Sequence, residues 1–153
     1  MNWIFAAAAA AALVAVATGA GFWFRARQGH VTVTAPATSR ADASGRDALD
    51  LGLDPRALGE ATLVQFSTEY CSRCPGTARS LGELAGRYDG VRHVEIDLTH
   101  DAKLADRFSV LQTPTTLVLD RSGTSIARIG GVPRQAELTA LLDRLTGSDH
   151  VLI

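Results

Sequence analysis

The feature that most constrains this chain is a run of 22 residues without a charge, residues 3–24. At 1.5 Å per residue, an α-helix of this length measures about 33 Å, which is enough to span a bilayer. Trp3 and Trp23 stand near its two ends, where tryptophan side chains favour the membrane interfaces. We therefore expect residues 1–27 to form a single transmembrane anchor.

A cleaved secretory signal is the alternative interpretation of this run. Small residues suited to cleavage occur at Ala15-Val16-Ala17 and at Thr18-Gly19-Ala20. Two features favour a retained anchor instead. No Lys or Arg precedes the run, and the run is longer than the apolar core of an ordinary signal peptide.

The distribution of arginines gives an expected orientation in the cell membrane. Only the α-amino group precedes the apolar run, whereas Arg25, Arg27, Arg40 and Arg46 follow it. Positive charge is enriched on the cytoplasmic side of membrane proteins. The sequence thus favours an N-terminus outside and the rest of the chain in the cytoplasm, over an extracytoplasmic location.

The other 129 residues are sufficient for one compact domain. The net charge of −1 and the lack of a basic run argue against nucleic acid as a partner. Residues 28–46 are rich in Ala, Thr, Ser, Gly and Arg, which predicts a flexible linker. Within this linker, Val31 to Thr34 alternates and is a candidate edge strand. We expect the folded domain over residues 47–150.

Apolar and β-branched patterns predict an α/β domain with a mixed four-stranded sheet, or five strands if Val31 to Thr34 joins it. The expected strands are 62–67, 92–97, 115–120 and 125–129. The expected helices are a short one after Asp54-Pro55, one from about Cys71 to near Gly90, one capped by Thr99 and reaching Phe108, and one after Pro133. Strands that alternate with helices imply a parallel pair, and the terminal hairpin adds an antiparallel pair.

The two cysteines of the chain lie three residues apart, in Cys71-Ser72-Arg73-Cys74. At the start of a helix, unpaired N–H groups and the helix dipole stabilise a thiolate on the first cysteine, and Arg73 adds positive charge. Cys71 would attack a partner disulfide, and Cys74 would resolve the mixed disulfide. Pro75 is compatible with the first turn of such a helix.

Three other interpretations of the cysteine pair carry less weight. A structural disulfide across two residues would remove little chain entropy. A zinc site requires four ligands, and His93, His100 and His150 have no paired spacing near the cysteines. An incidental pair of buried thiols would not explain why the motif stands between a predicted buried strand and a helix, with Thr113-Pro114 preceding a later strand.

Four segments in this order resemble the thioredoxin family: ATLVQFSTEYCSRC, HVEID, VLQTPTTLVLDRSG and IGGVPRQAELTALL, between Ala61 and Leu145. The resemblance implies a thioredoxin-like fold with Cys71 as the attacking and Cys74 as the resolving thiol. It also implies a cis peptide at Thr113-Pro114. The substrate groove implied by the resemblance comprises Tyr70, Ser72, Arg73, Thr113, Pro114, Gly130 and Gly131.

The sequence departs from the family pattern at the site itself. Tyr70 replaces the usual Trp before the first cysteine, and Ser72-Arg73 replaces Gly-Pro. Gln65 occupies the place of the buried aspartate that serves proton transfer at the resolving thiol. We expect the deprotonation of Cys74 to use water or another group. His93 replaces a usual lysine, and its alternation with Glu95 and Asp97 predicts a surface or edge histidine.

We expect a thiol–disulfide oxidoreductase that reduces protein disulfides at the membrane surface and is recycled by a reductase or another dithiol partner. No metal or bound organic cofactor is expected beyond the redox-active Cys71-Cys74 pair. One alternative is an extracytoplasmic protein for disulfide formation or haem-protein maturation. A second is a thioredoxin-fold binding module with little turnover, which the Gln65 departure favours.

Overall fold

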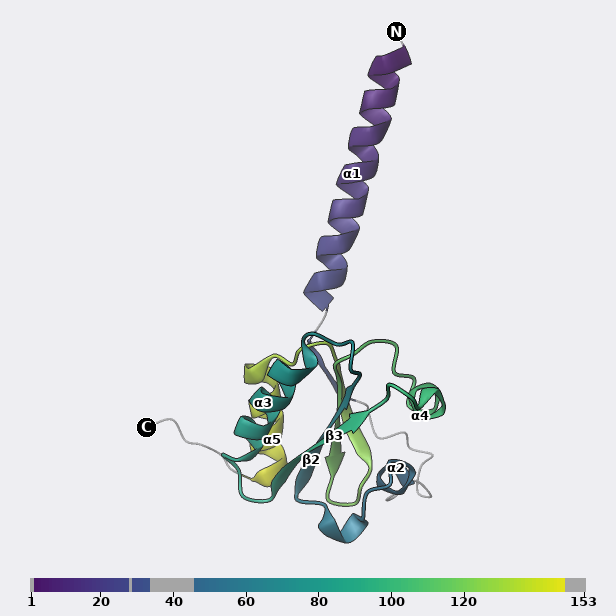
Figure 1. Cartoon of the computed structure of the whole chain (residues 1–153). Coiled ribbons are helices and arrows are strands. Elements are labelled where there is room, and N and C mark those ends of the chain that lie inside the picture. Colours follow the sequence, from purple (N-terminus) through teal and green to yellow (C-terminus); the bar gives the residue numbers. More distant parts are fainter. Residues whose placement is uncertain (1, 28, 34–45, 148–153) are drawn as a thin grey trace, which may run out of the picture.

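The structure is a computed structural model that describes residues 2–27, 29–33 and 46–147. In chain order the elements are α1 (Asn2–Arg27), β1 (Val31–Val33), α2 (Arg46–Asp50), the 3₁₀ helix η1 (Pro55–Ala57), β2 (Ala61–Ser67), α3 (Cys74–Ala85), β3 (Val91–Asp97), α4 (Ala102–Arg107), β4 (Thr115–Asp120), β5 (Ser125–Gly130) and α5 (Gln135–Thr146). Figure 1 shows α1 projecting from one end of the domain that the other elements form.

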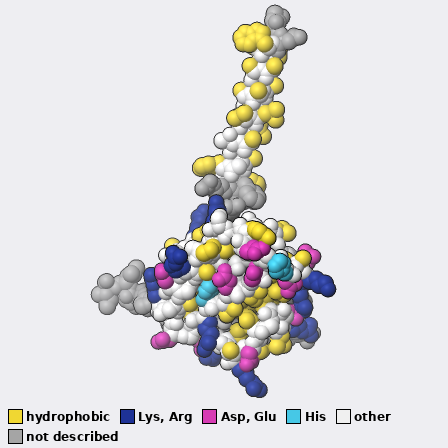
Figure 2. All heavy atoms as spheres, in the orientation of Figure 1, with side chains coloured by type: hydrophobic (Ala, Val, Ile, Leu, Met, Phe, Trp, Pro, Cys, Tyr) yellow, Lys and Arg dark blue, Asp and Glu magenta, His cyan; other side chains and the backbone are white. Residues whose placement is uncertain are grey.

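The α1 helix carries the predicted apolar run. Its stretch from Trp3 to Trp23 is exposed throughout and is long and apolar enough to cross a membrane, although an N-terminal signal sequence shares these properties. Figure 2 shows the contrast between the hydrophobic side chains of α1 and the charged surface of the domain. Retention of α1 as an anchor stays a prediction.

The domain is built on a five-stranded mixed sheet with the order β1-β5-β4-β2-β3. The inner strand β2 runs parallel to β3 and antiparallel to β4, and β4 forms a hairpin with β5. This arrangement confirms the predicted fold class and both kinds of strand pairing. Every residue of β2 is buried, because β2 has a neighbour on each side and helices over both faces.

The segment predicted as a flexible linker over 28–46 contains the strand β1, as the candidate edge strand within it indicated. Val31 pairs with Ile129 and Val33 with Ala127, so β1 is the edge strand that the alternating pattern suggested. Residues 34–45 and the end of the predicted domain at 148–150 lie outside the described residues. The sheet thus receives its first strand directly after α1.

Two hydrophobic clusters cover the two faces of the sheet. On one face, α3 and α5 contribute Leu81, Leu84, Leu138, Leu141 and Leu142, which pack on strand residues such as Leu63 and Val118. On the other face, Phe66 and Leu117 pack with residues of α2 and with Phe108 beyond α4. Figure 1 shows α3 and α5 on one side of the strands and α2 and α4 on the other. The sheet is therefore the middle of three layers.

The start of the α4 helix differs from the one predicted. The α4 helix is capped by Asp101, whose carboxylate accepts a hydrogen bond from the Leu104 N–H at 2.9 Å. Thr99, the predicted cap, instead donates to the Asp97 carboxylate and accepts from the N–H of Glu69 at 2.9 Å. Asp101 is better placed because its side chain reaches the third residue beyond it, as an N-cap requires.

Candidate functional site

The two cysteines lie where β2 passes into α3, and they form a disulfide with Cα atoms 5.4 Å apart. The Cys71 N–H donates to the Thr68 carbonyl at 3.0 Å, and the Cys74 N–H donates to the Cys71 carbonyl at 3.1 Å. These bonds hold the motif in a turn. The helix therefore begins at Cys74 and not at about Cys71, as predicted, which places Pro75 in its first turn.

The two sulfur-bearing residues differ in their access to solvent. Cys74 is only 3% exposed, whereas Cys71 is of intermediate exposure. Both line an open cleft of about 420 Å³, whose other walls include the carboxylates of Glu69, Glu95 and Asp97. An incoming sulfur can thus approach Cys71, while Cys74 is almost completely shielded from solvent.

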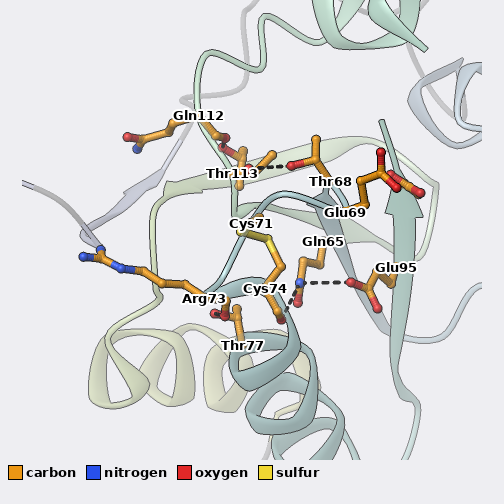
Figure 3. The surroundings of a disulfide bond; sticks show 12 residues. Gln65, Thr68, Glu69, Cys71, Arg73, Cys74, Thr77, Glu95, Gln112 and Thr113 are labelled. Carbon is orange, nitrogen blue, oxygen red and sulfur yellow. Dashed lines mark hydrogen bonds between the residues drawn. A yellow bond between two sulfur atoms is a disulfide. The ribbon is translucent and has the colours of Figure 1, made fainter. Parts of the chain in front are cut away.

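Gln65 lies on β2, beneath the disulfide, and is fully buried. Its side-chain amide donates to the Cys74 carbonyl at 3.1 Å and to the Glu95 carboxylate at 3.4 Å, as Figure 3 shows. Its Oε1 atom has no hydrogen-bond partner among the described residues. Gln65 therefore cannot supply a proton acceptor of its own, but it places one carboxylate close to Cys74.

Glu95 is the site residue that sequence reasoning did not assign. The parallel register pairs Gln65 with Glu95, so both side chains are directed to the same face of the sheet as neighbours. The sequence contains a signal for this pairing, because Gln65 and Glu95 each stand two residues before the last residue of their strands. Without the strand register, that signal does not identify a contact.

The loop before β4 approaches the cysteines from the opposite side. The Thr113-Pro114 peptide is cis, as predicted. The Thr113 hydroxyl lies 3.3 Å from the Thr68 hydroxyl, and the carbonyl of Thr68 accepts the Cys71 N–H. The Gly131 N–H donates to the Pro114 carbonyl at 2.8 Å. Thr68 and Gly131 thus join the Pro114 loop to the cysteine turn and to the end of β5.

The other predicted groove residues surround this centre. Tyr70 is 83% exposed, and Ser72 and Arg73 are also exposed. A hydrogen bond to Glu69, and then burial, raise the pKa of Tyr70, so its phenol is neutral at ordinary pH. A Cβ at Gly130 would lie 2.5 Å from the Gln112 amide nitrogen, so the flexible Gln112 side chain would have to move to admit it.

His93 lies on the edge strand β3, in agreement with the predicted surface or edge position. It is half-buried, with its Nδ1 facing Gly82 of α3. Burial lowers the pKa of His93, and Glu95 opposes this effect. Across the described residues, no group of three or more His, Cys, Asp and Glu side chains is placed to hold a metal ion.

Comparison with known sequences agrees with this geometry. The family model for thioredoxin matches residues 57–144, which is more than half of the chain. A thioredoxin of Staphylococcus haemolyticus is 29% identical over 96 residues, covering 62% of this chain and 91% of the relative. A thioredoxin of Chlamydia pneumoniae is 30% identical over 82 residues, covering 54% and 79%. The residues that the family model matches include the cysteine turn and the Pro114 loop.

Solved structures show the same fold. A thioredoxin of Nicotiana alata superposes with a TM-score of 0.53 at 24% identity, covering 67% of this chain and 87% of that one. Thioredoxin f2 of Chlamydomonas reinhardtii gives a TM-score of 0.52 at 22% identity, covering 65% and 90%. The family match begins at residue 57, so α1 and β1 precede the region that these similarities define.

Proposed function

Because the chain belongs to the thioredoxin family, whose members are thiol–disulfide oxidoreductases, we propose that it reduces protein disulfides at a membrane surface. The observation that carries the proposal is the Cys71–Cys74 disulfide, in which Cys71 is partly exposed and Cys74 is buried. This asymmetry suits an attacking thiol and a resolving thiol. The proposed reaction uses the cysteine pair alone, with no metal or bound organic cofactor.

Cys71 is the proposed nucleophile. It stands three residues before the first helical residue of α3, where unpaired N–H groups favour a thiolate. The thiolate attacks one sulfur of the partner disulfide, and the other sulfur leaves as a thiolate that takes a proton. Cys74 then attacks the Cys71 sulfur and the partner departs as a dithiol. Two electrons and two protons have passed from the cysteine pair to the partner.

Cys74 must lose its proton before this second attack, and Glu95 is the proposed acceptor. Its carboxylate lines the same cleft as Cys74 and is held at 3.4 Å from the Gln65 amide, which itself contacts the Cys74 backbone. A water in the cleft would carry the proton between them. Gln65 is thus a positioning residue, and its unpartnered Oε1 is suited to accept a hydrogen bond from the Cys74 thiol.

The remaining groove residues are proposed to hold the partner. Thr113 and Pro114 form one wall, Gly130 and Gly131 support it, and Tyr70, Ser72 and Arg73 form the opposite rim. Tyr70 offers a large apolar surface with a neutral phenol. The groove can therefore contact an extended segment on both sides of the attacked sulfur.

Membrane retention is a separate part of the proposal. The apolar α1 helix supports it, and the arginines that follow the apolar run favour a cytoplasmic domain that a soluble reductase recycles. A membrane-impermeant thiol reagent, applied to intact and lysed cells after mild reduction, tests on which side of the membrane the domain lies. Labelling of Cys71 only after lysis supports the cytoplasmic assignment. Labelling of intact cells would instead indicate disulfide formation or haem-protein maturation outside.

The reaction is tested by insulin reduction with dithiothreitol as the electron source, using the full chain in detergent. The wild-type protein should accelerate insulin precipitation, and Cys71→Ser should abolish the acceleration. Asp89→Ser, which alters an exposed residue away from the groove and leaves both thiols, is the matched control. Equal rates for the wild type and Cys71→Ser would overturn the proposed reaction and favour a binding module.

A further inference from the structure

The connection between α1 and the sheet is too short to let the domain move freely away from the end of the helix. The α1 helix ends at Arg27. Only two residues later, both backbone groups of Gly29 are hydrogen-bonded to the domain. Its N–H donates to the Gly130 carbonyl at 2.9 Å, and its carbonyl accepts from the Arg134 N–H at 3.2 Å. Two residues of chain reach at most about 7 Å, whichever direction α1 takes.

The residues after Gly29 reinforce this attachment. The Glu137 carboxylate accepts the Val31 N–H at 2.9 Å and lies 2.9 Å from the His30 ring nitrogen. The Val31 N–H holds the pKa of Glu137 below its usual value, with His30 and Arg134 acting in the same direction. Gly29 has a φ of +80°, and a Cβ there would lie 2.5 Å from the Val132 carbonyl, so the tight connection requires glycine.

The attachment point lies at the active-site end of the domain. Gly29 contacts Gly130, and the next residue, Gly131, donates to the Pro114 carbonyl at 2.8 Å. Beyond Pro114, the Thr113 and Thr68 hydroxyls are 3.3 Å apart, and Thr68 accepts the Cys71 N–H. Figure 1 shows α1 leaving the domain at the end where α3 begins. The cysteine turn and the base of α1 therefore share one end of the sheet.

The surface at this end is suited to a protein more than to lipid. Tyr70, Leu111 and Val132 expose 83%, 94% and 46% of their area. An apolar cavity of about 260 Å³ between α3 and α5 is lined by Leu81, Leu84, Val132 and Leu138. However, the carboxylates of Glu69, Glu95 and Asp97 line the neighbouring cleft. Anionic lipid headgroups would repel these carboxylates, so insertion of this end into the bilayer is disfavoured.

We propose that the active-site end of the domain faces the bilayer and that its partner is a cysteine pair of an integral membrane protein, located close to the membrane surface. The inference rests on the proposed retention of α1. The short connection keeps Cys71 near the base of the helix, where it meets such a pair at high effective concentration. A disulfide on a bulky soluble protein would have to enter the space between the domain and the membrane.

The orientation can be tested with the full chain in liposomes of phosphatidylcholine that carry a nitroxide on the headgroups of both leaflets. A fluorophore is placed on Cys71 in the Cys74→Ser variant. The matched control carries it on Asp89→Cys in a chain that also has Cys71→Ser and Cys74→Ser. Asp89 is exposed and lies beside Val91, which pairs with Ala61 at the far end of β2. The seven residues of β2 separate the two ends by about 23 Å.

Nitroxide quenching acts over a shorter range than this separation. We expect quenching at Cys71 to exceed quenching at position 89 by about threefold or more, since the two probes differ in depth by about 23 Å. Equal quenching, or stronger quenching at position 89, would overturn the inference. The mass of the purified chain shows whether α1 is retained. If α1 is absent, the proposed tether fails and this inference fails with it, whereas equal quenching with α1 present refutes the inference alone.

A kinetic experiment tests whether the chain prefers a disulfide close to the membrane surface. The probes are two transmembrane peptides with a disulfide-linked quencher, one at the membrane boundary and one beyond a long polar extension. The wild-type chain should reduce the boundary disulfide about tenfold faster, as its effective concentration predicts. An insertion of about fifteen Gly and Ser residues after Arg27 adds roughly 20 Å of reach and should remove this preference. Insulin reduction measured in detergent, where no bilayer restricts access to the site, should be the same in both chains. The proposed partner would be contradicted if the chain with the insertion still preferred the boundary disulfide, or if the wild-type chain showed no preference for it.

Discussion

The side-chain amide of Gln65 is hydrogen-bonded to the carboxylate of Glu95 at 3.4 Å, and the same amide donates to the Cys74 carbonyl at 3.1 Å. One buried neutral residue thus connects the resolving cysteine to an exposed carboxylate on the neighbouring strand. At the position of Gln65 the family pattern has an aspartate. In this chain that position of β2 holds the neutral Gln65, and the neighbouring carboxylate is that of Glu95 on β3.

This relationship predicts that Glu95→Gln slows the second step of the reaction. Cys74 would lose its proton to bulk water, so release of the partner should slow by about tenfold near neutral pH. This is less than the 10²–10⁴ of a direct general base, because the proposed transfer passes through water. Single-turnover release of a fluorescent peptide from its mixed disulfide with Cys71 measures the step. The defect should shrink at alkaline pH, where hydroxide accepts the proton.

Two control variants separate proton transfer from a change in cleft charge. Asp97→Asn removes another carboxylate of the same cleft and should leave the release rate nearly unchanged. The double variant Gln65→Asp/Glu95→Gln places a carboxylate on β2, at position 65, and should restore the rate of partner release. If Asp97→Asn slows release as much as Glu95→Gln does, the role assigned to Glu95 is wrong.

The core beneath the site predicts a large effect of Phe66→Ala on stability. Phe66 is fully buried one residue before the end of β2, and its ring lies 5.7 Å from that of Phe108. Truncation to alanine should lower the free energy of unfolding by about 3–5 kcal/mol. Phe66→Leu keeps most of the volume and should cost less than about 1.5 kcal/mol. Urea unfolding followed by far-UV circular dichroism gives both values, and equal losses would contradict the packing described.

His93 predicts a pH dependence of stability. Burial lowers the pKa of this half-buried histidine below its usual 6.5, and Glu95 acts in the opposite direction. The unfolded chain therefore binds the proton first as the pH falls. Stability should be fully present above about pH 6.5 and should decrease between that pH and the lower pKa of the folded state.

Thermal unfolding at about pH 7.5 and pH 5.5 measures this decrease, a range set by the histidine pKa. His93→Gln should reduce the change in melting temperature between the two conditions. His100→Gln, at an exposed position after β3, is the control and should leave the change as in the wild type. A change in melting temperature that is the same in His93→Gln and the wild type would refute the prediction.

The fold could be predicted largely from local patterns. The buried run of β2, the alternation in β3 and the turn at Arg121-Ser122-Gly123 each depend on neighbouring residues alone. Within the predicted linker, β1 was harder to predict, because three residues form a strand only when β5 offers them an edge. The α2 helix was missed for the same reason. Its five residues are held by the Ala48 N–H bond to the Gly123 carbonyl, across the sheet.

The site was predictable where the chemistry lies in adjacent residues. Cys71, Cys74 and Pro114 follow from short motifs, and the cis peptide before Pro114 is present. Glu95 and the attachment of Gly29 depend on contacts between distant segments. The parallel register brings Glu95 to Gln65, and β1 pairing brings Gly29 to Gly130. Such contacts are set by the strand order, which a single sequence does not specify.

The central claim is that Cys71 exchanges with partner disulfides while Cys74 releases them. It is tested most directly by expressing Cys74→Ser and Cys71→Ser chains at equal levels and separating membrane proteins on non-reducing gels. Cys74→Ser should accumulate disulfide-linked adducts that disappear on reduction, because the first bond forms and nothing resolves it. Cys71→Ser should accumulate none. Equal adducts in both variants, or none in Cys74→Ser, would contradict the account.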